Sequence, residues 1–266
     1  MKPINFKNKV VLITGASSGI GKEFAKNLAS QGANLIITAR SNLDLIDLAK
    51  ELESQHSGIW VKTIPLDLTQ LNASQALFSS ITDMELSVDY LINNAGFGKF
   101  CEFSEETFET YHNMLMLNIN ALVELTHLCL PNMKKNNSGG IINVASTASF
   151  QPLPYLAVYA ASKAFVLSFS EALSGELLDT NIHIMALCPG PTESRFMKNA
   201  NADTSSMKLA SSKDVVNSAL ANYTKHRIYT VSGTLNYLMS LIPRLVSRKL
   251  TVKITANMSK NRILKN

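Results

Sequence analysis

The chain has 266 residues, of which 46% are hydrophobic and 17% charged, and this composition predicts one large α/β domain whose sheet is buried on both faces. No apolar run reaches the roughly 18 residues of a membrane span, and the polar residues 1–8 lead directly into an apolar run, which predicts no signal peptide. The net charge of +5 is uneven, because residues 1–214 hold all 20 acidic residues against 16 basic ones, whereas residues 215–266 hold nine basic residues and no acidic one.

Strands and helices are predicted to alternate along the chain. The predicted strands cover residues 9–14, 33–40, 60–66, 88–92, 141–145, 182–187 and 227–231, with Gly139-Gly140 as the turn before the fifth. The predicted helices cover residues 22–29, 42–55, 70–82, 105–136 as two helices or one bent helix, and 157–179. Such alternation predicts a doubly wound parallel sheet of about seven strands, with right-handed crossovers and helices on both faces.

Three glycines follow the first predicted strand. Gly15, Gly19 and Gly21 have the spacing GxxxGxG and lead into the first predicted helix. Glycines permit a tight turn and a close backbone approach, and a helix N-terminus directs free N–H groups at an anion. The pattern predicts a cradle for dinucleotide phosphates; the alternative is an ordinary glycine-rich turn.

Two titratable residues share one face of the predicted helix 157–179. Tyr159 and Lys163 are four residues apart, which places an ammonium one turn from a phenol. A nearby cation favours the phenolate and lowers the phenol pKa, which would suit Tyr159 to proton transfer. The alternative is a solvated tyrosine beside a surface lysine.

Five motifs in order resemble the short-chain dehydrogenase/reductase family, in its single-domain TGxxxGxG/YxxxK form. They are TGASSGIG at 14–21, NNAG at 93–96, Ser146, YAASK at 159–163 and PGPT at 189–192. Residues 150–158, the PGPTES segment and the basic tail are similar to bacterial ketoreductases and hydroxysteroid dehydrogenases. The resemblance implies a Rossmann-like fold and an oxidoreductase that uses a nicotinamide cofactor.

The resemblance also implies catalytic roles. Tyr159 would be the general acid in carbonyl reduction, and Lys163 would lower its pKa and bind the nicotinamide ribose. Ser146 would hold the substrate carbonyl oxygen. Asn118 would hold a water that relays protons, with Asn120 as the neighbouring candidate; read without the family, Asn118 is a buried asparagine that binds helix backbone.

The cofactor-binding residues that the resemblance implies follow the strand ends, where open α/β sheets bind ligands. They are Gly15, Ser17, Ser18, Gly19, Ile20, Gly21, Arg40, Ser41, Asp67, Leu68, Asn94, Ala95, Gly96, Tyr159, Lys163, Pro189, Gly190 and Thr192. Asp67 would pair with the adenine amine, and Thr192 would bind the nicotinamide carboxamide. The alternative for Asp67 is a helix N-cap, although Thr69 is the better cap by position.

The residue that ends the second strand predicts which dinucleotide binds. A carboxylate there binds the ribose 2′-hydroxyl, whereas a basic residue accommodates a 2′-phosphate. Arg40 occupies this position, with Ser17 and Ser41 as further donors, and predicts NADP(H) over NAD(H). Ser18 departs from the basic residue that many NADP-dependent relatives have before the second glycine.

Apolar side chains are predicted to surround the nicotinamide. They are Phe97, Phe100, Phe103, Phe150, Leu153, Pro154, Leu156 and Met197. Such a pocket suits a ketone, aldehyde, steroid-like or acyl substrate, and the polar residues 193–212 are predicted to form a mobile lid over it. The predicted function is carbonyl reduction to an alcohol; the alternative is a non-catalytic NADP-binding or sensor protein on the same fold.

The predicted domain divides into a catalytic part, residues 1–232, and a basic amphipathic extension, residues 233–266. The extension could pack as a lid or dimer helix, rest on an anionic membrane surface, or contact an acyl-carrier protein. The three cysteines and five histidines lack metal-ligand spacing, so no metal is predicted and the thiols fit a cytoplasmic protein, with peripheral membrane contact as the alternative. The resemblance implies a homodimer or homotetramer, and no nucleic-acid partner is expected.

Overall fold

A single parallel sheet organises the protein, for which a computed structural model describes residues 4–205, 207–260 and 262. The seven strands have the order β3-β2-β1-β4-β5-β6-β7, and every neighbouring pair is parallel. They are β1 Val10–Thr14, β2 Asn34–Ala39, β3 Val61–Pro65, β4 Tyr90–Asn93, β5 Gly139–Val144, β6 Ile182–Cys188 and β7 Tyr229–Val231. The Rossmann-like sheet predicted from βα alternation is confirmed, and its strand order reverses between β1 and β4.

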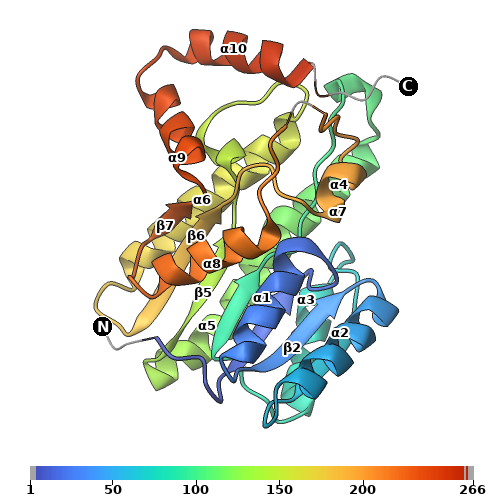
Figure 1. Ribbon diagram of the computed structural model, residues 1–266, viewed down its shortest axis with the longest axis vertical. Coiled ribbons are helices and arrows are strands. Elements are labelled where there is room, and N and C mark those ends of the chain that lie inside the picture. The colour runs from blue at the N-terminus through green and yellow to red at the C-terminus, as the bar shows by residue number, and fades with distance from the viewer. Residues whose placement is uncertain (1–3, 206, 261, 263–266) are drawn as a thin grey trace.

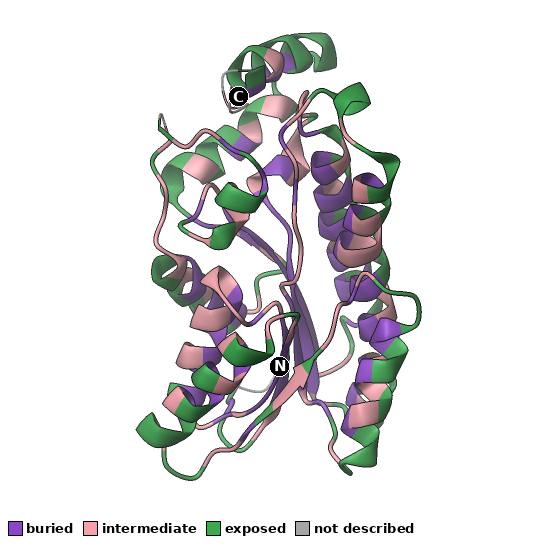
Figure 2. Ribbon diagram, turned by 90° about the vertical axis from the view of Figure 1, so that its right-hand side faces the viewer, coloured by how far each residue is buried: buried purple, intermediate pink, exposed green. Residues whose placement is uncertain are grey.

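Helices cover both faces of the sheet (Figures 1 and 2). The helices of one face are α1 Gly19–Ser30, α2 Asn42–Gln55 and α8 Ser212–Tyr223, and those of the other are α3 Ala73–Asp83, α5 Ala121–Asn136 and α6 Ala157–Glu176. Phe24 and Leu28 of α1 are fully buried against the first face, and Leu77 of α3 against the second. Burial of these apolar stripes fixes each helix on the sheet.

Gly139 and Gly140 lie inside β5, which corrects their predicted role as a turn. Gly140 pairs with Tyr90 and with His183 of the two neighbouring strands. A Cβ at Gly139 would collide with the Asp89 carbonyl, and one at Gly140 with the Tyr223 hydroxyl. The glycines are therefore needed where neighbouring groups approach the strand closely.

The helix after β3 begins later than predicted, at Ala73. Asp67 Oδ1 accepts hydrogen bonds from the backbone N–H and the hydroxyl of Thr69, at 3.0 and 2.9 Å. These bonds close a turn before the helix, whose N-cap is Asn72 in the left-handed region at φ 60°. Neither Asp67 nor Thr69 caps the helix, so that alternative role for Asp67 is excluded.

One continuous helical stretch runs from residue 108 to 136. It joins α4 Phe108–Leu115, a π-helical turn η2 Met116–Asn120 and α5, which corresponds to the predicted bent helix. It is long and apolar enough by length and composition to cross a membrane, with a mean hydropathy of 1.3 in its 18-residue window, contrary to the expectation that no segment would qualify. Its buried residues Leu125, Cys129 and Met133 pack on the sheet, as expected for a helix that covers a sheet face.

The C-terminal residues form two helices beyond β7. They are α9 Thr234–Leu241 and α10 Arg248–Lys260, joined through η4 Ile242–Arg244 with Pro243 at its second position. Figure 1 shows α9 and α10 at the top of the molecule, away from the N-terminal helices. Pro243 ends the first helix as its missing N–H and fixed ring require. Lys265, counted in the basic tail, lies outside the described residues.

Candidate active site

A cavity of about 580 Å³ lies at the carboxyl ends of the strands. Its walls come from the loops after β1, β2, β3, β4, β5 and β6, from α6, and from the C-terminal helices. The predicted site residues on its wall are Gly15, Ser17, Ser18, Gly19, Ile20, Arg40, Ser41, Asp67, Leu68, Asn94, Ala95, Gly96, Ser146, Tyr159, Lys163, Pro189, Gly190 and Thr192. Gly21 and Asn118 lie behind this wall. The fold thus brings together residues separated by more than half the chain.

The glycine loop has the geometry of an anion cradle. Gly15 and Gly19 adopt positive φ, 67° and 54°, and a Cβ at Gly21 would collide with the Gly15 carbonyl. Ser18 is the extended N-cap of α1 and makes no side-chain capping bond, and the first turn of α1 has no acidic residue. Free N–H groups at this helix start face the cavity, so the loop fits the phosphates of a dinucleotide.

Hydrogen bonds join the loops after β1 and β4. The Thr14 hydroxyl accepts from the backbone N–H groups of Asn94 and Ala95, both at 3.0 Å. The Asn94 side-chain amide donates to the carbonyls of Thr14 and Gly15, at 2.9 and 3.1 Å. Asn94 therefore holds the glycine loop in place. Thr14 was missed as a site residue, although the TG step of the first motif was its signal.

The groups at the ends of β2 and β3 would face the adenosine half of a dinucleotide. Arg40 is exposed, and no carboxylate of residues 4–205, 207–260 and 262 pairs with it. Ser41 caps α2, its hydroxyl accepting from Asp44 N–H at 3.4 Å. The Thr38 hydroxyl lines the cavity, is buried, and has no hydrogen-bond partner in the described chain. The Arg40 guanidinium is therefore available to a polar ligand here, whereas the Thr38 hydroxyl is covered by the protein.

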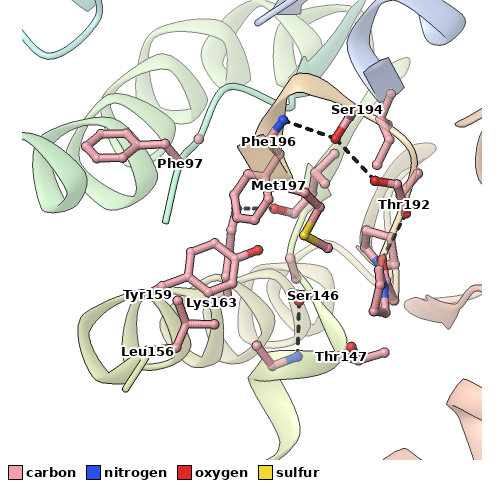
Figure 3. Close-up of a pocket in the computed structure, with 18 of the residues that line it drawn as sticks. Phe97, Ser146, Thr147, Leu156, Tyr159, Lys163, Thr192, Ser194, Phe196 and Met197 are labelled. Atoms are coloured by element: carbon pink, nitrogen blue, oxygen red, sulfur yellow. Dashed lines mark hydrogen bonds between the residues drawn. The ribbon is translucent and has the colours of Figure 1, made fainter. Parts of the chain in front are cut away.

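Tyr159, Lys163 and Ser146 meet at the centre of the cavity (Figure 3). Helix α6 presents Tyr159 and Lys163 on one buried face. Lys163 Nζ donates to the Val144 carbonyl at 2.7 Å and lies 5.8 Å from the centroid of the Tyr159 ring. Ser146 follows β5, where its hydroxyl accepts from Ala148 N–H at 3.1 Å. The prediction that Tyr159 and Lys163 share one face of a helix is confirmed.

Burial is the main influence on the pKa values of Tyr159 and Lys163. It raises the pKa of Tyr159 to about 12, an effect that the Ser146 side chain partly offsets and Cys188 reinforces. Burial also lowers the pKa of Lys163 to about 8. The expected lowering of the Tyr159 pKa is therefore wrong for this structure, because loss of solvent is the largest influence on that pKa.

Asn118 joins three segments from its place in the π-helical turn η2. Its Oδ1 accepts from Phe97 N–H at 3.1 Å, and its Nδ2 donates to the Phe97 carbonyl and the Ser162 hydroxyl, both at 3.0 Å. A Cβ at Gly96 would lie 2.9 Å from Asn118 Oδ1 and 3.3 Å from Lys163 Nζ. The side chain of Asn118 thus binds the loop after β4 and helix α6, and its relay of protons through a water stays a prediction.

Apolar side chains surround the Tyr159 ring. Of the predicted set, Phe97, Phe100, Leu153, Leu156 and Met197 line the cavity. The others do not: Phe103 is exposed and stacks on Tyr111, Phe150 packs near Tyr229, and Pro154 lies off the wall. Phe196 was missed, and its ring centroid lies 5.3 Å from that of Tyr159.

The predicted lid lies across the cavity and touches the glycine loop. It contains the short helix α7 Arg195–Asn199. Arg195 pairs with Asp44 of α2 at 2.6 Å, and a Cβ at Gly19 would lie 2.7 Å from Ser194 Cβ. The segment after β6 is therefore tied to α2 and packs against the glycine loop.

The C-terminal helices complete the wall of the cavity, which agrees with packing as a lid, one of the roles expected for the extension. The cavity residues from α9, η4, the loop after it and α10 are Asn236, Met239, Ser240, Ile242, Pro243, Val246, Thr251, Ile254, Thr255, Met258 and Ser259. Asn236 also packs against Gly190, where a Cβ would collide with its amide. Residues 233–260 therefore form part of the site rather than an appendage.

Comparison with known proteins places these features in a wider group. Residues 9–205 match the family model of the short chain dehydrogenases. An uncharacterized oxidoreductase of Staphylococcus saprophyticus is 30% identical over 82% of this chain and 92% of its own length. A fatty acyl-CoA reductase of Acinetobacter baylyi is 38% identical over 69% of this chain and 62% of its own. The solved short-chain dehydrogenase from Sphingobium yanoikuyae in complex with NADPH has a TM-score of 0.81 and 30% identity, covering 89% of this chain and 94% of that one.

Proposed function

This chain belongs to the short-chain dehydrogenase family of oxidoreductases, and on that premise we propose that it reduces an apolar ketone, aldehyde or acyl-type carbonyl with NADP(H). The observation that carries the proposal is one continuous cavity that joins Arg40, the glycine loop and the pair Tyr159–Ser146. A dinucleotide along the strand ends would place its reactive end beside the phenol. The apolar wall near Tyr159 would take the substrate.

Tyr159 supplies the proton in this proposal. A bound nicotinamide supplies the hydride, and the protein supplies position and proton. With a pKa of about 12, the buried Tyr159 phenol is protonated at neutral pH and can donate to the carbonyl oxygen as negative charge develops there. The Ser146 hydroxyl, on the same wall, would donate a second hydrogen bond to that oxygen.

Lys163 acts next to this phenol. Its Nζ, near Tyr159 and anchored on the Val144 carbonyl, would bind the ribose hydroxyls of the cofactor. With a pKa of about 8 the ammonium is charged in most molecules at neutral pH and neutral above that value. In its charged form it stabilises the phenolate that proton donation leaves behind. Asn118 is a positioning residue, since it holds the Phe97 loop against α6.

Arg40 supports the preference for NADP(H). Its exposed guanidinium, without a carboxylate partner in the described residues, suits bidentate contact with a 2′-phosphate. No acidic residue stands at the end of β2 to bind a 2′-hydroxyl instead. The relative from Sphingobium yanoikuyae, solved with NADPH, lends the same preference support.

The deciding experiment measures NADPH and NADH oxidation by the purified protein against ketones, aldehydes, quinones and 3-oxoacyl thioesters. We expect turnover with NADPH, a lower kcat/KM with NADH, and loss of turnover in Tyr159→Phe. Tight NADPH binding without turnover across the panel would instead favour the sensor alternative. A preference for NADH would contradict the role given to Arg40.

A further inference from the structure

The outer surface of α9, η4 and α10 is unusually apolar, and we call it the C-terminal surface. Its large exposed apolar residues are Leu235, Tyr237, Leu238, Met239, Ile242, Leu245, Leu250, Val252, Ile254 and Met258. Leu245 is 84% exposed. Soluble proteins rarely leave such residues contiguous unless something covers them.

Helix α10 is oriented with its hydroxyl residues inward. Thr251, Thr255 and Ser259 are spaced by one turn, are buried, and line the cavity. Lys249 and Lys253 lie on the opposite face at the same spacing, with Leu250 flanking them. The large apolar residues of α10, Leu250, Val252, Ile254 and Met258, are exposed beside these lysines, and Ile254 and Met258 also line the cavity.

The positive charge of the C-terminal surface indicates which kind of partner can cover it. Residues 234–260, which form the C-terminal surface, hold no acidic residue and five basic ones: Arg244, Arg248, Lys249, Lys253 and Lys260. A second copy of the same surface would bring these like charges together, which opposes self-association. Residues 1–214 have a net charge of −4, so the positive charge of the protein is concentrated toward the C-terminus. Apolar side chains surrounded by lysine and arginine match the headgroup region of an anionic bilayer.

The mouth of the cavity lies in this same surface. Ile242, Ile254 and Met258 line the cavity and are also 44%, 44% and 41% exposed. These residues connect the apolar wall near Tyr159 with the outside. A bilayer resting on the C-terminal surface would thus meet an apolar opening rather than an aqueous one.

We propose that the C-terminal surface docks on an anionic lipid bilayer, and that the cavity receives its carbonyl substrate from the lipid phase. Docking on the bilayer is inferred from the exposure and charge of the C-terminal surface alone. Delivery of a substrate from the lipid phase rests also on the proposed reductase function. The substrate class is then a long-chain or polycyclic carbonyl compound that partitions into membranes. The basic residues supply attraction to the headgroups, and the apolar residues supply insertion.

The docking test is co-sedimentation of the full-length protein with NADPH on phosphatidylglycerol–phosphatidylcholine vesicles and on phosphatidylcholine alone. We expect binding to the anionic vesicles that weakens as salt rises, and much weaker binding to the neutral ones. Lys249→Gln/Lys253→Gln should lower the affinity for anionic vesicles about 30-fold. The reason is that each of the two lysines contributes about equally to the attraction between the protein and the anionic headgroups. Leu245→Ser should lower it by at least about tenfold.

Matched controls lie on the sheet half of the protein. Lys134→Gln/Lys135→Gln removes two exposed lysines from the end of α5, and Leu71→Ser removes a leucine that is 82% exposed. Neither control should change vesicle binding. All four variants should keep their unfolding temperature and their turnover of a water-soluble carbonyl, so that a loss of docking is separate from a failure of the reductase function.

The docking proposal would be overturned by no binding to anionic vesicles, by equal binding to neutral ones, or by variants and controls that behave alike. Concentration-dependent self-association lost in Leu245→Ser would also overturn it, in favour of a second copy as the occupant. Salt-sensitive binding to a purified acidic carrier protein without vesicle binding would replace the bilayer with that partner. Equal turnover of a membrane-dissolved ketone by wild type and by Lys249→Gln/Lys253→Gln would overturn the lipid-phase delivery.

Discussion

Helices α1 and α10 place opposite kinds of side chain toward the protein. Helix α1 buries Phe24 and Leu28 against the sheet, in agreement with its sequence periodicity. Helix α10 buries Thr251 and Thr255 against the cavity and leaves Ile254 partly outside. Core burial therefore fixes α1, whereas α10 is placed as the wall of a binding site and as an outer surface.

The two regions also differ in what a substitution should cost. The sheet and the helices packed on it, which we call the sheet half, are stabilised by buried apolar contacts. Substitutions there should therefore lower the free energy of unfolding. The C-terminal helices line the cavity and leave many apolar side chains exposed, so substitutions there should change binding more than the free energy of unfolding. Tyr159 and Lys163 line the cavity, so substitutions there should change activity and the free energy of unfolding independently of each other.

The largest effect is expected for Tyr159→Phe. Removal of the proton donor should lower kcat about 10²- to 10⁴-fold. NADPH affinity should change little, because the ring and its packing against Phe196 stay. Steady-state rates with NADPH titration measure both.

Tyr111→Phe is the matched control. Tyr111 belongs to the same apolar cluster, but its hydroxyl donates to the Phe103 carbonyl outside the main cavity. Its kcat should stay within a few-fold of wild type. A comparable loss in both variants would show that packing, and not the Tyr159 proton, limits turnover.

A leucine pair tests the contrast between core and surface directly. Leu35 of β2 is fully buried, whereas Leu245 is 84% exposed. Leu35→Ala should lower the free energy of unfolding by about 2–5 kcal/mol, and Leu245→Ala should change it by less than about 0.5 kcal/mol. Urea unfolding of both variants gives the comparison. A large destabilisation by Leu245→Ala would mean that the C-terminal helices belong to the cooperative core.

Lys163→Met should separate stability from function. Burial lowers the pKa of Lys163 from 10.5 to about 8, so holding its charge costs stability at every pH below 8. The variant should therefore be inactive, yet more stable than wild type at pH 7 by about 1–3 kcal/mol.

The pH dependence of this gain has a defined sign. As the pH rises from 8 toward 10.5, the folded wild type loses the Lys163 proton before the unfolded chain does, and its stability recovers. The advantage of the variant should shrink over this window, as urea titrations at several pH values would record. A constant difference between the two proteins would contradict the lowered pKa.

The smallest effect is expected for Arg40→Ala. Loss of one charge-assisted contact at an exposed site should lower kcat/KM for NADPH about tenfold. The kcat/KM for NADH should stay the same, which makes the second cofactor the internal control. Equal losses with both cofactors would indicate that Arg40 shapes the site instead of recognising a 2′-phosphate.

Much of the sheet half could be predicted because its signals are local. The apolar run ending at Thr14, the glycine spacing and the helix 42–55 each report on a few neighbouring residues. The placement of Tyr159 and Lys163 on one helix face follows from a four-residue spacing. The Gly139-Gly140 turn was wrong, because the need for glycine there comes from Asp89 and Tyr223, which are distant in sequence.

Several properties of the site depend on contacts that no local pattern contains. The pKa of Tyr159 rises with burial among apolar side chains from distant segments, such as Phe100 and Phe196. Asn118 uses its side chain on Phe97 and Ser162, which only the folded chain brings near. The cavity wall from α9 and α10 likewise has no sequence motif.

By itself, the sequence determined the parallel sheet, the family and the group of residues at the strand ends, because periodicity and motif spacing are written along the chain. The tertiary structure decided which of these groups are dry, what their pKa values are, and which face of α10 meets the cavity. The physical reason is that desolvation and packing depend on all neighbours in space at once. Helix α10 is the clearest case, since its sequence left open whether it packs on the protein or rests on a membrane, and the fold decided that Thr251 and Thr255 line the cavity.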